Sequence, residues 1–589
     1  MRRFGRIIVA TLAVVGLLFL VGIGLAIWGA VALHGGGESA LSKHMVLTLD
    51  LENPFKDAPT HDPFAALSGE DTYVTRDVVE AIDRAAKDAR VVGLFATVGH
   101  AQMGIGRAQE VRDAVGRFRA SGKPAVLFAE TLGEFGNGTV ETYLASAFGQ
   151  VWLQPSGDVG LTGFMAESPF LRGTLDLLGV EPQFAGRKEY KTAIETFTEK
   201  KFSPANAETL NGLLDGWTAQ VVAGIAEGRK LPADKVRALY GKGPFLAGEA
   251  LSVGLVDKLG YRDEALSAAG GGNDPDEVDV ADYAAHAPKG KGTRIALITG
   301  EGAIQRGEAG RGFGSEGGFG SDTIAGALRD AIDDDDVKAI LFRVDSPGGS
   351  YVASDTVWHE VKRARAAGKP VVVSMGNVAA SGGYFVSMGA DRIVAQPGTI
   401  TGSIGVFTGK MVLADFWPKL GVSWDELHRG DNATMWSPNR AFSPQSWERV
   451  NVMLDRIYAD FTTKAADGRR MPLDKLEPNA RGRVWTGAEA KALGLVDALG
   501  GYDVAKAQVR ELLKLPADAQ LDMVAFPEPE SPLEMLSKLA SRGGMAEDKG
   551  AESMIRAARV LAPLLDKLEA ASPQAGALRL PVGPAELPR

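Results

Sequence analysis

The stretch GLVDKLG at residues 254–260 recurs as GLVDALG at residues 494–500, and this recurrence is the first indication of an internal repeat. Other short stretches recur in the same order and at near-constant spacing: Phe202-Ser203-Pro204 as Phe442-Ser443-Pro444, and GKP at 122–124 as GKP at 368–370. Ordered self-similarity over such a span indicates a duplicated structural unit. We therefore predict that the chain contains two copies of one fold.

Each copy is predicted to be an α/β unit. Apolar, β-rich runs such as Ala339–Val344 alternate with helical patterns such as Ser354–Ala367, and this alternation is typical of a parallel sheet covered by helices. The Gly- and Asp-rich stretch GGGNDPDEVDV follows the first copy and is typical of a boundary. The expected segments are residues 1–43 (cytoplasmic N-terminus and transmembrane anchor), 44–265 (N-terminal repeat), 266–292 (linker), 293–515 (C-terminal repeat) and 516–589 (C-terminal extension with a disordered end).

Composition excludes several classes of function. Hydrophobic residues make up 45% and charged residues 23% of the 589 residues, which are ordinary values for a globular protein. The net charge of -10 disfavours nucleic acid as a partner. Because cysteine is absent, disulfides, thiolate metal sites and cysteine nucleophiles are excluded. No cofactor fingerprint is present, and we interpret the acidic run Asp333–Asp336 as a solvated loop rather than a metal site.

The N-terminus carries an uncharged run from Ile7 to Leu33, which is longer than the roughly 20 residues needed to cross a bilayer. Arg2, Arg3 and Arg6 precede it, and no comparable basic cluster follows. The positive-inside rule then places the N-terminus in the cytoplasm and the body outside it. A cleaved signal peptide is the competing interpretation, but the apolar core is longer than such peptides carry. We expect one retained membrane anchor.

Two glycine-rich turns follow predicted strands in the second copy. One is DSPGGS at residues 345–350, and the other is MGNVAASGGY at residues 375–384. Backbone N–H groups exposed where a turn meets a helix can form an oxyanion hole, and Ser381 on the second turn is presented like the serine of a nucleophile elbow. Alone, each motif has a plainer interpretation, as a tight turn or a helix N-cap. The pair is more specific than either turn.

A nucleophilic serine needs a base, and histidine is the usual one. None of the seven histidines lies in either glycine-rich turn, which disfavours a Ser–His–Asp triad. A buried lysine can replace histidine if burial lowers its pKa from about 10.4 toward roughly 7–8. Burial cannot be read from the sequence, so these residue patterns alone do not select one lysine.

Taken in order, the motifs EYKTAIETF (189–197), DSPGGS (345–350), AASGGY (379–384) and TGSIGV (401–406) resemble those of the signal peptide peptidase A family, also called protease IV, in its long duplicated form. The resemblance covers nearly the whole chain. It implies a tandem crotonase/Clp-like fold and a serine peptidase with a Ser/Lys dyad. Such an enzyme would use no cofactor and no metal.

Four site residues follow from this resemblance. It implies that Ser381 is the nucleophile and Lys191 the general base, and that the backbone N–H groups of Gly349 and Gly382 donate to the oxyanion. It also implies a homotetramer at the inner (cytoplasmic) membrane, with its body on the periplasmic side. The implied substrates are cleaved signal peptides and other extended apolar peptides.

The internal repeat offers a separate check on this division of roles. Aligning the two copies places Val140 opposite Ser381 and Ala433 opposite Lys191, so each copy lacks what the other provides. We therefore predict one composite site, either within one protomer or across two. Lys188 is the main rival for the base, but it lies outside the matched motif.

Two other functions share some of these features. A crotonase-like enzyme acting on acyl-CoA thioesters would have the oxyanion turn but would need neither Ser381 nor Lys191. A non-catalytic membrane scaffold would keep the fold alone.

Overall fold

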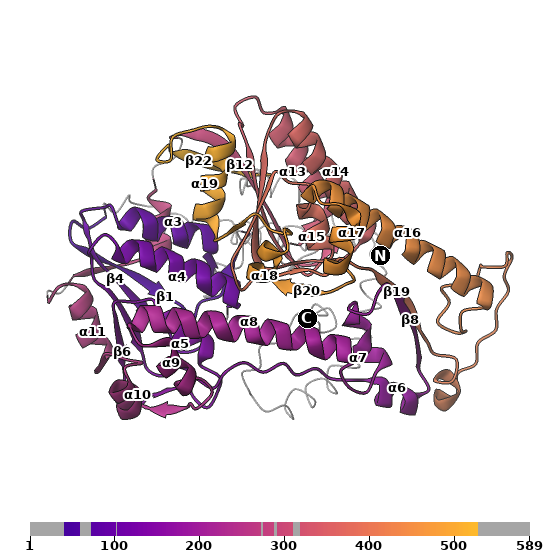
Figure 1. Cartoon of the computed structure of the whole chain (residues 1–589), viewed down its shortest axis with the longest axis horizontal. Coiled ribbons are helices and arrows are strands. Elements are labelled where there is room, and N and C mark those ends of the chain that lie inside the picture. Colours follow the sequence, from indigo (N-terminus) through magenta and orange to yellow (C-terminus); the bar gives the residue numbers. More distant parts are fainter. Residues whose placement is uncertain are drawn as a thin grey trace, which may run out of the picture.

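The computed structural model describes residues 41–58, 72–101, 103–272, 275–287, 291–309 and 318–527. The predicted membrane anchor and most of the expected C-terminal extension lie outside these residues. Among the described residues, no helix has both the length and the apolar character needed to cross a membrane. The body is α/β and is built on two large sheets (Figure 1).

The first sheet has six parallel strands in the order β10-β6-β5-β4-β1-β11. Helices cover both of its faces, because successive side chains of a strand point to opposite sides. Leu47 packs in the core that includes α3 and α4, whereas Val46 packs against α11. The bounds are β1 Met45–Asp50, α3 Thr75–Ala85, β4 Val91–Thr97, α4 Ile105–Arg119, β5 Ala125–Ala129, β6 Gln150–Leu153, β10 Lys258–Leu259, α11 Arg262–Ala269 and β11 Asp276–Asp279.

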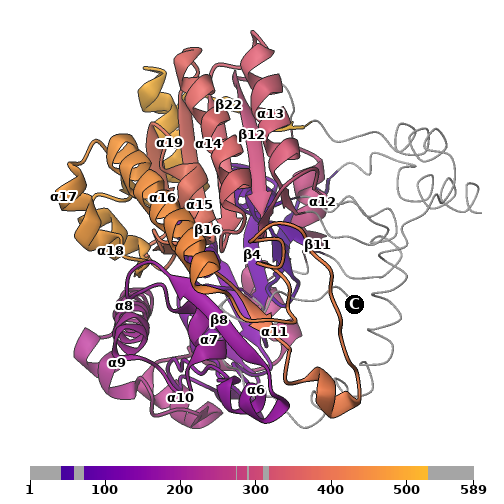
Figure 2. The same ribbon diagram turned by 90° about the vertical axis from the view of Figure 1, so that its right-hand side faces the viewer.

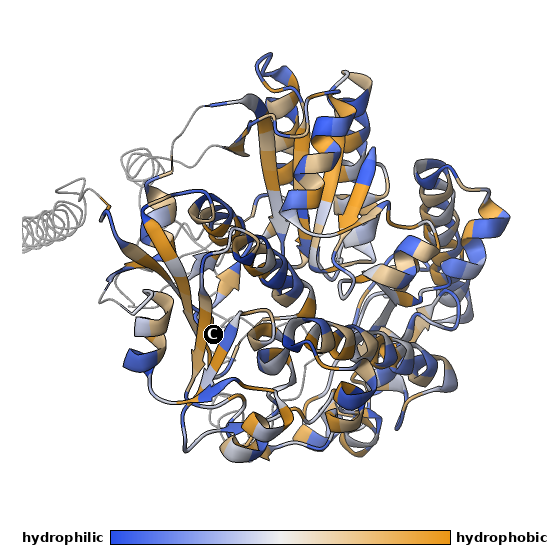
Figure 3. Ribbon diagram, turned by 60° about the vertical axis from the view of Figure 1, so that its left-hand side comes forward, coloured by the Kyte–Doolittle hydropathy of each residue, from blue (hydrophilic) through white to orange (hydrophobic). Residues whose placement is uncertain are grey.

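The second sheet repeats this plan with parallel strands in the order β21-β17-β16-β15-β12-β22. Helices α13, α14 and α15 cover one face, and α19 covers the other. Figure 3 shows that the strands in both halves are mostly hydrophobic. The bounds are β12 Thr293–Glu301, α13 Ser321–Asp333, β15 Ile340–Ser346, α14 Tyr351–Ala366, β16 Val371–Ala380, α15 Gly382–Ser387, β17 Arg392–Ala395, β21 Ala498–Leu499, α19 Tyr502–Leu512 and β22 Leu521–Phe526.

Each half also contains one antiparallel strand pair and one long helix. In the first half the pair is a separate small sheet, whereas in the second half it belongs to the large sheet, because one of its strands pairs with β16. Strand β7 (Asp158–Val159) pairs with β9 (Phe245–Leu246), as β18 (Ile400–Gly402) pairs with β20 (Val484–Thr486). The long helices are α8 (Pro204–Arg229) and α16 (Pro444–Arg469), each of 26 residues. Both are capped by the serine of the recurring Phe-Ser-Pro motif, whose side chain accepts from a backbone N–H and whose proline occupies the first turn.

The GLVD motif recurs because its aspartate has the same structural task in both halves. Asp257 Oδ2 accepts a hydrogen bond of 2.7 Å from Val151 N at the start of β6, and its carboxylate pairs with Arg229 at the end of α8. One residue therefore ties strand to helix. The matching contacts of the second half run from Asp497 to Ile393 N and Arg469.

The sheets extend beyond the expected segment boundaries. Strand β11 and helix α12 (Val280–Ala285) lie in the expected linker, and β11 pairs with β1 to form an edge of the first sheet. Strand β22 lies in the expected C-terminal extension and forms the same edge of the second sheet. The sequence of β11, Asp-Glu-Val-Asp, lacks an apolar run because an edge strand tolerates charge. The crotonase/Clp-like type of each repeat stays a prediction.

The two halves are joined by a strand pair as well as by packing. Strand β8 (Glu181–Gly186), from the first half, pairs antiparallel with β19 (Phe407–Val412), from the second (Figure 2). Helix α8 runs from the first half to lie against β20 of the second (Figure 1). Residues far apart in the sequence therefore meet along this boundary.

Candidate active site

Lys191 and Ser381 meet at this boundary. Lys191 Nζ lies 3.0 Å from Ser381 Oγ, within hydrogen-bond distance. Lys191 follows β8 at the start of the 3-10 helix Thr192–Ile194, and Ser381 stands between β16 and α15. The two side chains are therefore brought together within one chain, by one element from each repeat.

The amine of Lys191 is buried. Its residue is only 7% exposed, and burial alone lowers the pKa of Lys191 to about 7. Among the residues that the structure describes, no carboxylate pairs with it to hold the proton. Gly482 packs so closely that a Cβ on it would lie 2.7 Å from the Cβ of Lys191. A neutral amine at neutral pH is what a general base requires.

Lys188, the rival base, differs from Lys191 because it is exposed and has a carboxylate partner. Its side chain is 42% exposed, and Nζ forms an ion pair of 3.3 Å with Glu477. The ammonium also lies over the ring of Tyr458. The two lysines therefore differ in burial and in ion pairing, and Lys191 is the one that contacts Ser381.

Ser381 has an unusual backbone conformation, with φ 53° and ψ -114°. A residue other than glycine at such a position is strained and depends on its surroundings to be held there. Ser381 N donates to Gly402 O at 2.9 Å, and Ser381 O accepts from Phe385 N at 2.9 Å. Although Ser381 occupies the N-cap position of α15, its side chain makes no capping hydrogen bond. The hydroxyl instead faces Lys191.

The two glycine-rich turns lie against each other beside Ser381. A Cβ on Gly382 would come within 3.1 Å of Gly349 N, and a Cβ on Gly348 within 2.7 Å of Gly382 N. Gly349 has φ 153° and bridges to Ile304. Within the described ranges, neither Gly349 N nor Gly382 N has an acceptor. Two neighbouring free amides next to a serine hydroxyl are suited to binding a developing oxyanion.

Ser403 completes the surroundings of the lysine, and no role for it was predicted. Lys191 Nζ lies 2.9 Å from Ser403 Oγ and 3.0 Å from Ser403 O. Ser403 has φ 51°, and its N donates to Arg483 O at 2.7 Å, which fixes the backbone. The signal was present in the TGSIGV motif, but its contact with Lys191 joins residues 212 positions apart.

The structure shifts one of the positions predicted from the repeat. Gly138, rather than Val140, caps α5 (Thr139–Ala145) as Ser381 caps α15. Aligning Tyr143 with Tyr384 selects Val140, but Tyr143 is the fifth residue of α5 and Tyr384 the third of α15, which moves the register by two residues. Ala433, opposite Lys191 in the alignment, is exposed in a loop. Neither counterpart position carries a nucleophile or a base.

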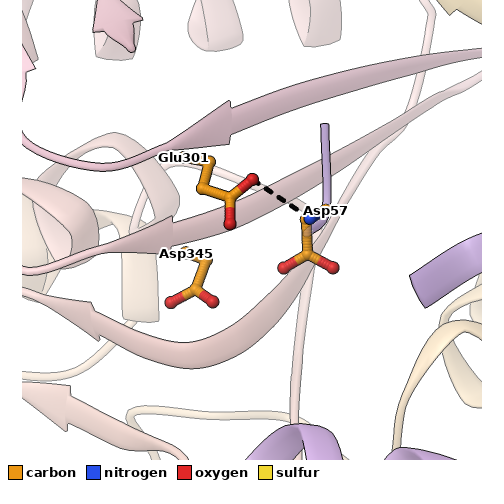
Figure 4. A group of neighbouring side chains, drawn as sticks. All are labelled: Asp57, Glu301 and Asp345. Atoms are coloured by element: carbon orange, nitrogen blue, oxygen red, sulfur yellow. Dashed lines mark hydrogen bonds between the residues drawn. The ribbon is translucent and has the colours of Figure 1, made fainter. Parts of the chain in front are cut away.

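A cluster of charged side chains lies beneath these turns, and it includes the carboxylates of Asp57, Glu301 and Asp345 (Figure 4). Their oxygens are close enough to share a cation. Arg107 Nη2 already lies 3.1 Å from Asp57, 3.2 Å from Asp345 and 3.6 Å from Glu301. Arg343 Nη2 lies 3.1 Å from the other oxygen of Asp57, and the two guanidinium groups lower the pKa of Asp57 to about 2. The cluster is therefore a network of ion pairs.

The chain is similar in sequence to known peptidases. The model of peptidase family S49 matches residues 117–273 and 363–516. Protease 4 of Salmonella typhi is 33% identical over 527 residues, covering 85% of this chain and 83% of its own. The chloroplastic serine protease SPPA of Arabidopsis thaliana is 32% identical over 502 residues, covering 82% and 71%. A putative signal peptide peptidase SppA of Enterococcus faecium is 32% identical over 188 residues, covering 32% and 55%.

Proposed function

Because the chain belongs to peptidase family S49 and is a serine peptidase, we propose that Ser381 is its nucleophile and Lys191 its general base. The observation that carries this assignment is the distance of 3.0 Å between Lys191 Nζ and Ser381 Oγ. The burial that lowers the pKa of Lys191 to about 7 supports it, since half of the amine is then neutral near pH 7.

In this mechanism, neutral Lys191 takes the proton of Ser381 as Oγ attacks the carbonyl carbon of the scissile peptide bond. The negative charge that develops on the carbonyl oxygen is stabilised by the N–H groups of Gly349 and Gly382. The ammonium of Lys191 then gives its proton to the leaving amine nitrogen, and an acyl-enzyme on Ser381 remains. Water, deprotonated by Lys191, attacks the ester carbonyl, and the ammonium returns its proton to Ser381 Oγ as the carbonyl–Oγ bond breaks and the acid product leaves. Ser403 keeps the amine directed at Ser381 throughout.

The proposed substrates are extended apolar peptides, with cleaved signal peptides as the main class. The support is the resemblance of the site motifs to signal peptide peptidase A and the similarity to the Enterococcus faecium protein. The proposed location is the cytoplasmic membrane, with residues 7–33 as a single anchor and the body on the outer side. A reporter fused after residue 43 should then be exported, and a cytoplasmic reporter signal would contradict this topology.

We also propose that the chain assembles into a ring, as a homotetramer. Within one chain, β8 follows Gly179 and pairs with β19, which precedes Gly421. Gly179 and Gly421 are equivalent positions of the two repeats, and residues 165–170 precede Gly179 by the same interval at which β19 precedes Gly421. Residues 165–170 and residues 423–428 are the counterparts of β19 and β8, and neither has a strand partner among the described residues. Pairing of these segments between neighbouring protomers would be a head-to-tail contact, the type that generates a ring when the rotation between protomers closes.

Labelling with a serine-directed fluorophosphonate tests the central assignment. We expect the probe to form one covalent adduct per chain, found by mass spectrometry on the peptide that contains Ser381. A crotonase-like enzyme or a scaffold would not react. An adduct on another serine, or none at all, would remove Ser381 from the mechanism.

A further inference from the structure

The charged cluster beneath the active-site turns joins the two repeats through one arginine. Arg107 lies on α4 of the first repeat, and its guanidinium is almost fully buried. Besides the carboxylates described above, Nη1 donates to Phe55 O at 2.6 Å. Its contact of 3.2 Å with Asp345 reaches into the second repeat, because Asp345 is the first residue of the glycine-rich turn DSPGGS.

Asp345 in turn holds the strand that leads to Ser381. The pairing of β15 with β16 is interrupted here, since Val344 lies opposite Met375 and Ser346 opposite Ala379. Asp345 is therefore the one residue of β15 that faces a bulge of three residues on β16. Its Oδ1 accepts a hydrogen bond of 3.0 Å from Val378 N, three residues before Ser381.

The bulge is also held from the first repeat by backbone contact. Arg107 N donates to the side chain of Asn377, inside the bulge, at 2.9 Å. Gly104 packs so closely that a Cβ on it would lie 2.6 Å from that amide group. The start of α4 therefore touches the bulge both through the backbone and, by way of Asp345, through the Arg107 side chain.

A carboxylate in this position depends on its cationic neighbours. The side chain of Asp345 is only 13% exposed, and burial together with the charge of Asp57 raises its pKa, while Arg107 and Arg343 oppose that rise. Glu301 is the remaining carboxylate that faces it. Without Arg107, these three carboxylates would be left with the guanidinium of Arg343, which already pairs with Glu110 at 2.8 Å. Protonation of Asp345 would then weaken its hydrogen bond to Val378 N.

We propose that Arg107 is a positioning residue for the peptidase reaction. Through Asp345 and the β16 bulge, it holds the turn that presents Ser381 and the oxyanion amides. The active turn of the second repeat is then competent only while the first repeat is docked against it. This inference rests on the proposed function of Ser381 and Lys191.

Variants at position 107 test it on a purified full-length enzyme, with kcat and KM for an apolar peptide ester measured between pH 5 and 9. The wild-type acid limb should follow one proton, that of Lys191. For Arg107→Met we expect kcat near neutral pH to fall roughly tenfold to a hundredfold with little change in KM. We also expect an acid limb that follows two protons, because loss of Arg107 raises the pKa of Asp345 further and its protonation then adds to that of Lys191. Arg107→Lys should restore part of kcat and the one-proton limb.

Arg112→Met is the matched control. Arg112 is a partly buried arginine of the same helix, but its hydrogen bonds, to Tyr143 O, Ser146 Oγ and Gly224 O, stay within the first repeat. It should lower the thermal unfolding temperature while leaving the one-proton acid limb unchanged. If Arg107 had a purely structural role, Arg107→Met would likewise lower the thermal unfolding temperature and keep the one-proton acid limb.

Asp345→Asn closes the test, because asparagine can still accept from Val378 N but cannot titrate. Adding Arg107→Met to it should then leave the acid limb at one proton, with losses in kcat that are not additive. Wild-type kcat and pH profile in Arg107→Met, or additive losses in the double variant, would overturn the inference. If Arg107→Met does not fold, kcat and the acid limb are measured instead for Arg107→Lys, Asp345→Asn and their double variant. Additive losses in kcat in that double variant would again overturn the inference. A wild-type enzyme that the fluorophosphonate does not label would instead refute the proposed function.

Discussion

The two repeats share strand order, long helices and the GLVD clamp, but they differ at the turn before the short helix. In the second repeat this turn holds Ser381 in a strained conformation beside two free amides. In the first repeat Gly138 takes the same place with φ -97°, and a Cβ on it would lie 1.8 Å from Leu132 O. That turn is packed shut and has no room for a serine. Both copies thus keep the fold, but together they form only one proposed site, to which the first copy contributes Lys191 and the second Ser381.

The strongest test of this asymmetry is removal of the serine. We expect Ser381→Ala to lower kcat by roughly 10³–10⁶, because the nucleophile is lost while the fold is kept. The measurement is turnover of an apolar peptide ester together with thermal unfolding. Ser146→Ala is the control, since Ser146 is a buried serine of the first repeat outside the proposed site. Turnover by Ser381→Ala at the wild-type rate would show that the second repeat does not supply the nucleophile through Ser381.

The contribution of the first repeat is tested at Lys191. Lys191→Ala and Lys191→Arg should both lower kcat nearly as far as the loss of the serine, because guanidinium stays protonated and cannot act as a base. Wild-type kcat should rise with pH through about 7, since the amine is active only above its pKa. Lys188→Ala, the matched control three residues away, should keep this pH–rate profile. A larger loss at Lys188 than at Lys191 would reverse the assignment.

Ser403 belongs to the second repeat, but its hydroxyl contacts the lysine of the first. Ser403→Ala should lower kcat roughly tenfold to a hundredfold, since the amine loses one of the groups that direct it at Ser381. Fluorophosphonate labelling should slow in proportion. Ser403→Thr keeps the hydroxyl and should recover part of the rate; equal rates for the alanine variant and the wild type would leave Ser403 without a role.

The smallest effect concerns stability rather than rate. Because the pKa of Lys191 is lowered from 10.5 to about 7 in the folded protein, its burial costs free energy below pH 10.5 and the cost grows as pH falls to about 7. Lys191→Met should therefore raise the free energy of unfolding near pH 7, by an amount on the order of a few kcal/mol. The difference from wild type should shrink toward pH 10.5. Equal stability of both proteins at all pH values would contradict burial of the amine.

Most of the architecture could be predicted from short, local sequence patterns. The recurring Phe-Ser-Pro and GLVD stretches mark a helix cap and a strand clamp, so the duplication could be predicted from sequence. The motif resemblance selected Lys191 and Ser381, which the structure brings within 3.0 Å. The burial of Lys191 could not be predicted, because it arises from second-repeat glycines such as Gly482. Contacts between distant segments, such as those of Ser403 and Arg107, leave no local signature.

The order of the two contributions along the chain has a consequence during synthesis. Domains generally fold from the N-terminus as they leave the ribosome, so the first repeat can form while the serine has yet to be translated. Strand β22, which completes the edge of the second sheet, ends only at Phe526. An unfinished chain then holds the proposed base without its nucleophile. The proposed site can therefore form only after the strands of the second sheet, through Phe526, have been translated.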